Sequence, residues 1–170
     1  MIKTLKIAFP IICLFILSSC NSHIEPEDLG RNVLNSFKKQ DVEAGLSYIL
    51  NEEDYRDFYS NSTLDNGKKE ELIKEYTSPN KISELRKKFR KRFHKITEDG
   101  EKAGIVWKNV TFDYIEGPKL NKDLYGVQAD EIYVFFSYNS VKYKLTLDDC
   151  FNCSRGWLMS DEPRLTKVSE

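Results

Sequence analysis

The spacing of apolar residues changes once along this chain, near Lys102, and that change constrains the fold more than any other feature. Before Lys102, apolar residues recur every three or four positions, which is the period of an amphipathic helix. After it, apolar and polar residues alternate, which is the period of a half-buried strand. Helices followed by strands with hairpin-length connections are typical of α+β domains with an antiparallel sheet.

The first half of the chain predicts a series of helices. The clearest begins at Ser78-Pro79, which provides a favourable N-cap and first turn. Its apolar residues are spaced three or four apart from Ile82 to Ile96, and it is expected to end near Asp99-Gly100. The other predicted helices span residues 28–39, 42–50, 52–59 and 68–76.

The second half predicts strands over residues 105–115, 129–138, 141–148, 156–160 and 165–168. The segment 129–138 is apolar on both faces. One face carries Ile132, Val134 and Phe136, and the other largely carries Tyr133, Phe135 and Tyr138. Because helices can cover only one side of a single sheet, the second face is predicted to be a pocket or interface, covered by a ligand, a homodimer partner or another protein. The alternative is a sheet that curls enough to bury both faces by itself.

The predicted architecture is α+β, with N-terminal helices packed on a curved, cone-like antiparallel sheet of about four to five strands. The predicted domain covers residues 28–170, and a chain of 170 residues is typical of a single domain. An aromatic content of 12% and a formal net charge of -1 exclude a disordered chain. The lack of a basic excess argues against a nucleic-acid partner.

Residues 1–19 are typical of an export signal that is removed. A positively charged start precedes the apolar run Ile7–Leu17, which is shorter than the roughly 20 residues that span a bilayer. The run ends in Leu17, Ser18 and Ser19, followed by Cys20. This ending resembles the lipobox of bacterial lipoproteins. The alternative is an ordinary signal peptide with the same ending.

The lipobox resemblance implies where the protein is located. In lipoproteins the peptidase cuts before the cysteine, so Cys20 is expected to carry the lipid, palmitate among its acyl chains, and residues 20–27 to form a short tether. Several acyl chains on one residue give stable attachment to a membrane. The expected location is the bacterial cell envelope. The outer membrane, facing the periplasm or the cell surface, is favoured because Asn21 rather than Asp follows the cysteine.

Two further cysteines, Cys150 and Cys153, form a C-x-x-C pair. Because an exported chain meets an oxidising environment, the pair is predicted to be a structural disulfide that clips a hairpin turn. Zinc binding and a thioredoxin-like redox role are the alternatives. A zinc site would need more ligands than His23 and His94 can add, and a redox pair is expected to open a helix. We therefore expect no metal and no other cofactor.

Two short segments resemble nuclear-transport-factor-two-like domains, a group that includes ketosteroid-isomerase-like proteins within the cystatin-like folds. The segment Lys38–Leu46 resembles the junction of their first two helices, where Asp41 opens the second helix. The segment Gly156–Ser160 is similar to their last strand. The resemblance implies three helices packed on a curved antiparallel sheet around a cone-shaped pocket. Residues 68–98 depart from the minimal pattern as a helical insert.

Two functional classes agree with these features. The first is a non-catalytic binding or accessory module of the cell envelope. The second, implied by the ketosteroid-isomerase-like resemblance, is a small-molecule enzyme with a pocket lined by Asp and Tyr, for which Asp113 and Asp130 are candidate bases. With His94 as the single histidine of the folded region, no nucleophile–histidine pairing can be argued. No catalytic residue is assigned, and the binding module is expected.

Residues 81–95 carry many bases and a single acid, Glu84. On a helix, the apolar residues of this segment dock on the domain and the bases spread across the outer side. We predict that an anionic surface such as membrane headgroups is contacted by Lys87, Lys88, Lys91 and Arg92. The alternative is a solvated helix whose bases pair with acids on neighbouring elements.

Overall fold

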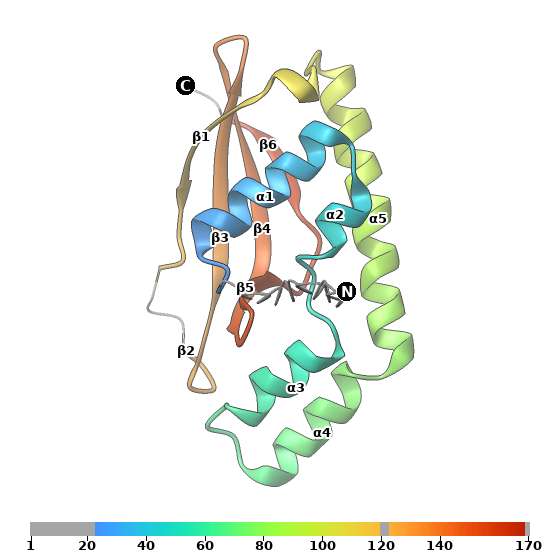
Figure 1. Cartoon of the computed structure of the whole chain (residues 1–170), viewed down its shortest axis with the longest axis vertical. Coiled ribbons are helices and arrows are strands. Elements are labelled where there is room, and N and C mark those ends of the chain that lie inside the picture. Colours follow the sequence, from blue (N-terminus) through green and yellow to red (C-terminus); the bar gives the residue numbers. More distant parts are fainter. Residues whose placement is uncertain (1–22, 120–122, 169–170) are drawn as a thin grey trace, which may run out of the picture.

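The computed structural model describes residues 23–119 and 123–168, in which five α-helices precede the strands (Figure 1). The helices are α1 (Pro26–Lys39), α2 (Val42–Leu46), α3 (Glu52–Ser60), α4 (Asn66–Tyr76) and α5 (Pro79–Lys102). A 3₁₀ turn, η1 (Trp107–Asn109), follows. The strands are β1 (Thr111–Glu116), β2 (Asp123–Leu124), β3 (Val127–Tyr138), β4 (Val141–Cys153), β5 (Gly156–Met159) and β6 (Arg164–Lys167).

The sheet is antiparallel, and its long central strands β3 and β4 hold the rest in place. Its order is β1-β3-β4-β5, while β6 pairs with the first half of β4 and β2 forms a short hairpin with β3. α1 lies across one face of the sheet and α5 runs alongside it (Figure 1). The prediction of N-terminal helices packed on a curved antiparallel sheet is confirmed.

The main core lies between α1, α5 and the covered face of the sheet. The ring of Phe37 in α1 stacks on Phe93 of α5, with 4.2 Å between the ring centroids. From the sheet, the predicted inward set of β3 is fully buried: Ile132, Val134 and Phe136. Burial of each such side chain contributes about 1.5–3 kcal/mol to folding, so this layer is a main source of stability.

The helix predicted over 42–50 is shorter than expected, because its second half pairs with the sheet instead. α2 ends at Leu46. Beyond it, the Leu50 N–H donates to the Met159 carbonyl at 2.9 Å, and the Met159 N–H donates to the Tyr48 carbonyl at 2.9 Å. These bonds bring residues 48–50 alongside β5 and give their backbone groups the partners that a helix would otherwise supply.

The strand predicted over 105–115 begins late, at Thr111, because Trp107 anchors a turn before it. The buried indole donates its N–H to the Thr97 carbonyl at 3.0 Å. A Cβ atom on Gly100 would approach the indole ring to 2.5 Å. The prediction that α5 ends near Gly100 is therefore wrong. Gly100 makes room for Trp107, and α5 continues to Lys102.

The folded domain begins earlier than residue 28. The Ile24 N–H donates to the Arg155 carbonyl at 2.9 Å, and the Trp157 N–H donates to the Ile24 carbonyl at 2.8 Å. The predicted tether of residues 20–27 therefore overlaps the fold from Ile24 onward. The lipidation site Cys20 and the lipobox residues Leu17, Ser18 and Ser19 lie outside the described residues. Among the helices of the described part, none has the length and apolar character needed to cross a bilayer.

Candidate functional site: a tyrosine-lined pocket

A cavity of about 350 Å³ opens where α3, α4 and α5 meet the far end of β4. Four tyrosines line it: Tyr55, Tyr59, Tyr76 and Tyr125. Its volume falls at the lower end of the range found for small-molecule sites, roughly 300–1,000 Å³. The cavity is therefore large enough for a small organic ligand.

Helix α3 supplies two of the tyrosines and is fixed at both its start and its side. Asn51 and Asp54 form a reciprocal capping box, with hydrogen bonds of 3.1 and 2.8 Å. The buried Asp54 carboxylate also accepts two hydrogen bonds from Arg155 in the β4–β5 turn, at 2.8 and 2.6 Å. Because Tyr55 and Tyr59 are one helical turn apart, both face the cavity, and their rings lie nearly parallel with centroids 6.4 Å apart.

Helix α4 brings the third tyrosine across the cavity. The Tyr76 ring centroid lies 5.4 Å from that of Tyr55 and 5.5 Å from that of Tyr59. The ammonium group of Lys81, from the start of α5, lies 5.5 Å from the centre of the Tyr76 ring, within the range of a cation–π contact. None of the α4 residues is fully buried, so α4 is a lightly packed cover over this aromatic cluster.

The sheet end of the cavity provides polar groups beside aromatic side chains. Phe151 of β4 stacks on Phe58 of α3 with centroids 4.4 Å apart. Ser160 lines the cavity beside Tyr55 and partly offsets the rise in the pKa of the Tyr55 hydroxyl. Asp149 and Asp161 line the cavity near Ser160. This side of the pocket can therefore hydrogen-bond a ligand whose apolar part contacts the rings.

The fourth tyrosine comes from the β2–β3 turn. Tyr125 has a left-handed backbone, with φ at 58°, and its carbonyl accepts a hydrogen bond from the Thr63 N–H at 2.6 Å. The following Gly126 packs so closely on Thr63 that a Cβ atom would lie 2.3 Å from the threonine methyl carbon. The loop between α3 and α4 therefore positions Tyr125 over the cavity, where its side chain remains 45% exposed.

The buried tyrosines of the pocket remain protonated at physiological pH. Burial, with a further contribution from the neighbouring Tyr76, raises the pKa of both Tyr55 and Tyr59 well above the ordinary value. Protonated phenols donate and accept hydrogen bonds but are weak nucleophiles and weak bases. The pocket chemistry is therefore suited to recognition.

The candidate bases Asp113 and Asp130 do not line the pocket. Asp113 is exposed and accepts a hydrogen bond from Ser137 at 3.0 Å. Asp130 accepts hydrogen bonds from the Lys119 and Glu131 backbone N–H groups at 2.6 and 2.8 Å. His94 is exposed on α5. Within residues 23–119 and 123–168, no group of three or more His, Cys, Asp or Glu side chains could hold a metal ion.

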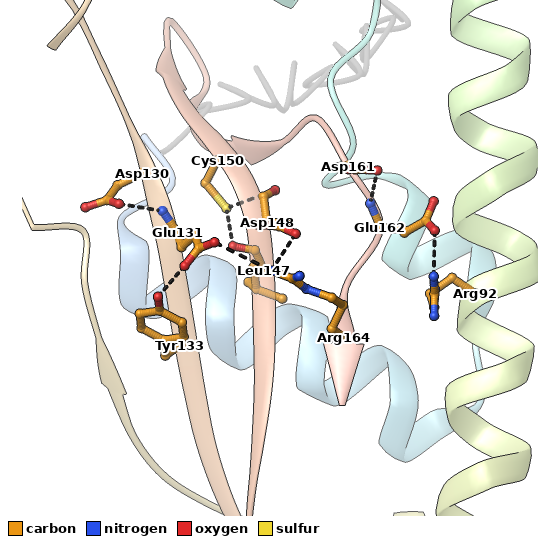
Figure 2. Close-up of polar contacts among 10 residues, drawn as sticks. All are labelled: Arg92, Asp130, Glu131, Tyr133, Leu147, Asp148, Cys150, Asp161, Glu162 and Arg164. Atoms are coloured by element: carbon orange, nitrogen blue, oxygen red, sulfur yellow. Dashed lines mark hydrogen bonds and ion pairs between the residues drawn. The ribbon is translucent and has the colours of Figure 1, made fainter. Parts of the chain in front are cut away.

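A carboxyl group with a raised pKa lies on the opposite face of the sheet from α1 (Figure 2). Burial and a hydrogen bond with Glu131 raise the pKa of Asp148 to about 6, although Arg164 lies 2.8 Å away and lowers it. Arg164 also lies 3.5 Å from Glu131, which accepts a hydrogen bond from the Tyr133 hydroxyl. Asp148 therefore lies outside the tyrosine pocket, whose own carboxylates are Asp149 and Asp161.

The predicted pocket or interface residues of β3 separate onto two faces. Tyr133 and Phe135 are half-buried on the face that α1 leaves uncovered. Tyr138 instead packs against the main core, because it has the same alternation as Phe136. Tyr133 and Phe135 therefore lie on the second face of β3, as expected, whereas Tyr138 lies on the same side as the main core.

The basic residues of α5 have different surroundings. Arg92 forms an ion pair with Glu162 at 2.9 Å. Lys88 lines the tyrosine pocket. Lys87 and Lys91 are exposed along α5. Contact with an anionic surface therefore stays a prediction, for which Lys87 and Lys91 are the better placed residues.

The disulfide expected between Cys150 and Cys153 does not fit this fold, in which both are free, buried thiols. Both residues belong to β4, and the turn begins only after Cys153. Three steps along a strand separate Cα atoms by ~10 Å, whereas a disulfide needs less than about 7 Å. The two side chains also join different apolar clusters. Burial raises the pKa of both thiols, to about 11 for Cys153.

Sequence reasoning did not find the tyrosine cluster. The pair Tyr55 and Tyr59, one turn apart on an acidic helix, was the available signal, but the same spacing is ordinary for a core-facing helix. Comparison with protein-family models, curated proteins and solved structures finds no match to this chain. The functional argument therefore depends on the pocket itself.

Proposed function

We propose that this protein is an exported, lipid-anchored, non-catalytic binding module of the bacterial cell envelope, and that the tyrosine-lined pocket binds its small-molecule ligand. The observation that carries the proposal is the cavity of about 350 Å³ surrounded by four tyrosines. The lipobox resemblance at Cys20 supports the anchor, with the outer membrane as the favoured location.

The lining of the pocket specifies the ligand class. The rings of Tyr55, Tyr59 and Tyr76 offer flat apolar surfaces to a planar group. Lys81 and Lys88 supply positive charge, and Asp149 and Asp161 supply negative charge. The ligand that fits this combination is a small polar aromatic compound, and one with both an amino and a carboxylate group uses both signs of charge.

Binding is favoured over catalysis by the protonation state of the buried phenols. Tyr55 and Tyr59 retain their protons, and the carboxyl group with a raised pKa, Asp148, lies on the other face of the sheet. A general base must reach the proton that it removes in a bound substrate. The candidates Asp113 and Asp130 lie outside the pocket. Asp149 and Asp161 do line it, so the alternative function, an enzyme with a pocket lined by Asp and Tyr, would have to use one of these two as its base.

The pocket can be tested with a thermal-shift series of aromatic amino acids, aromatic carboxylates and aromatic amines. The chain from residue 20 with Cys20→Ser provides the unlipidated protein. We expect one of these classes to raise the melting temperature, and Tyr76→Ala to abolish the shift. Tyr114→Ala, at an exposed tyrosine outside the pocket, is the matched control and should retain it. A shift that survives Tyr76→Ala, or no shift with any class, would contradict the proposal.

The anchor can be tested separately in bacteria. Cys20→Ala should prevent lipidation and processing before residue 20, and the protein should leave the washed membrane fraction. Metabolic labelling with an alkyne fatty acid should mark the wild-type chain alone. If Cys20→Ala is still labelled, the lipobox assignment is wrong, whatever the result in the pocket.

A further inference from the structure

The charged side chains of the tyrosine pocket come from α5 and from the sheet end of the cavity. Helix α5 supplies Lys81, Glu84 and Lys88, which are spaced three and four residues apart and therefore project from one side of the helix. The sheet end supplies Asp149 and Asp161. Both signs of charge line one cavity, with more acids than bases. How these groups are arranged therefore decides which ligand the pocket holds.

An ion pair fixes α5 against the segment between β5 and β6. Arg92 of α5 lies 2.9 Å from Glu162 (Figure 2). Lys88 is one helical turn before Arg92, and Asp161 is the residue before Glu162. Both Lys88 and Asp161 line the cavity. The ion pair therefore holds these two side chains near each other at one end of the pocket.

Lys88 and Asp161 themselves remain apart. Within residues 23–119 and 123–168, neither forms an ion pair with the other or with any other side chain. The Asp161 carboxylate accepts a hydrogen bond from the Glu162 backbone N–H at 2.8 Å through its Oδ1 atom. Glu84, one turn before Lys88, forms no ion pair in these ranges either. The Lys88 ammonium group and the Asp161 carboxylate can therefore each bind the opposite charge of a ligand between them.

The Tyr55 hydroxyl belongs to the same end of the cavity. The negative charges of Asp161 and Asp149 contribute to the raised pKa of Tyr55, so both carboxylates lie within electrostatic reach of the phenol. The Ser160 N–H donates to the Asp149 carbonyl at 2.9 Å, which holds β4 against the segment that carries Asp161. A protonated phenol accepts a hydrogen bond from an ammonium group and donates one to a carboxylate.

The remaining lining of the cavity is apolar or aromatic. Leu72 and Tyr76 contribute from α4, Leu85 from α5 and Phe151 from β4. Such a lining suits the ring of an aromatic ligand. Because Lys88 and Asp161 lie near each other, a ligand that uses both carries its ammonium and carboxylate groups close together. An α-amino acid carries both groups on one carbon atom.

We infer that the pocket binds an aromatic α-amino acid, with the carboxylate on Lys88, the ammonium group on Asp161 and the ring against the tyrosines. The inference rests on the proposed binding function and names the ligand class of the same pocket. Both head-group contacts are charge-assisted hydrogen bonds, which are stronger than neutral ones. An aromatic amine or an aromatic carboxylate uses only one of them. The excess of acids in the lining also disfavours a ligand that carries a carboxylate alone.

Titration calorimetry with matched compounds tests the inference. For the rings of phenylalanine, tyrosine and tryptophan, three compounds are compared: the α-amino acid, the amine that lacks its carboxylate and the acid that lacks its amine. Each is titrated into the chain from residue 20 with Cys20→Ser. For at least one ring, the α-amino acid should bind about tenfold or more tightly than either analogue, because each analogue loses one hydrogen bond to a charged group.

Two substitutions remove one charge each from the head-group site. Lys88→Gln should weaken binding of the α-amino acid about tenfold and leave binding of the amine within about twofold. Asp161→Asn should weaken binding of the α-amino acid by a similar factor without weakening binding of the acid. The matched control is Lys87→Gln, at an exposed lysine beside Lys88 that does not line the cavity. It should leave all affinities within about twofold. Circular dichroism of every variant shows whether the fold is retained.

The possible results separate this inference from the proposed function. If an analogue binds as tightly as its α-amino acid and Tyr76→Ala abolishes that binding, the pocket is a ligand site but the inference is overturned. The inference is also overturned if folded Lys88→Gln or Asp161→Asn retains the wild-type preference for the α-amino acid. Binding by none of the compounds overturns the inference and the proposed function together.

Discussion

Replacement of Asp148 by Asn should make the stability of this protein less dependent on pH. Asp148 lies beside Glu131 and Arg164 on the sheet face opposite α1, called the outer face below (Figure 2). Burial, the hydrogen bond with Glu131 and the negative charges of Glu131 and Asp149 raise its pKa from 3.8 to about 6, against the effect of Arg164. The folded state therefore holds this proton more tightly than the unfolded state does.

The sign and size of the effect follow from this difference. Below the unfolded pKa of 3.8 the proton is bound in both states, and the group's contribution to stability is fully present. The contribution is lost as the pH rises through about 6. The full shift corresponds to an upper limit of about 3 kcal/mol. Because Arg164 is 54% exposed and water screens the cluster, we expect about 1 kcal/mol.

Urea unfolding of wild type and Asp148→Asn at acidic and mildly alkaline pH measures this contribution. Asn resembles the protonated carboxyl group at every pH. The free energy of unfolding of the variant, relative to wild type, should therefore increase by about 1 kcal/mol between pH ~4 and pH ~8. Asp113→Asn, also on the outer face, is the matched control. A relative stability of Asp148→Asn that is constant or falls as the pH rises would refute the reasoning.

Two further predictions concern buried polar groups. Arg155→Met leaves the Asp54 carboxylate, which is 2% exposed, without its charged partner and should reduce the free energy of unfolding by about 2–4 kcal/mol. In urea unfolding, the double variant Asp54→Asn/Arg155→Met should recover part of that loss. Equal losses in the single and double variants would argue against the ion pair. Cys150 and Cys153 should react with iodoacetamide only after unfolding in the absence of reductant, because burial raises the pKa of both thiols; a pair that stays unreactive until reductant is added would restore the disulfide.

The sequence predicted α5 and β3 well because the apolar period of each, the stripe of α5 and the inward set of β3, is set by the element itself. It failed where a distant partner decides the local structure. Residues 48–50 look helical, but their backbone pairs with Met159, more than a hundred residues later. Gly100 looks like a helix end until Trp107 occupies the space beside it.

The pocket was not predictable for the same reason. Tyr55 and Tyr59 are neighbours on α3, but Tyr76, Tyr125 and Phe151 come from three other segments. No spacing in the sequence indicates that α4 lies over α3 or that the β2–β3 turn reaches the same cavity. The outer face was more accessible to prediction, because Tyr133 and Phe135 alternate with buried residues within a single strand.

The burial of Cys150 in the main core has a separate physical cause, an extra residue in β4. On β3, Asp130 and Ile132 are two residues apart. Their partners on β4, Cys150 and Leu147, are three residues apart. Asp149, with φ at 44°, lies within this bulge. The additional residue reverses the alternation, so that Leu147 and Cys150 both join the main core.

Without the bulge, regular alternation would direct residue 149 into the main core and turn Cys150 away from it. Deletion of Asp149 should therefore be far more damaging than its replacement. Asp149→Gly retains the extra residue and suits a left-handed backbone, so its free energy of unfolding should stay within about 1 kcal/mol of wild type. Deletion must either break the pairing beyond Leu147 or bury the wrong side chains, a loss of several kcal/mol by urea unfolding. If the deletion were as stable as Asp149→Gly, the bulge would have no part in holding the β4 register.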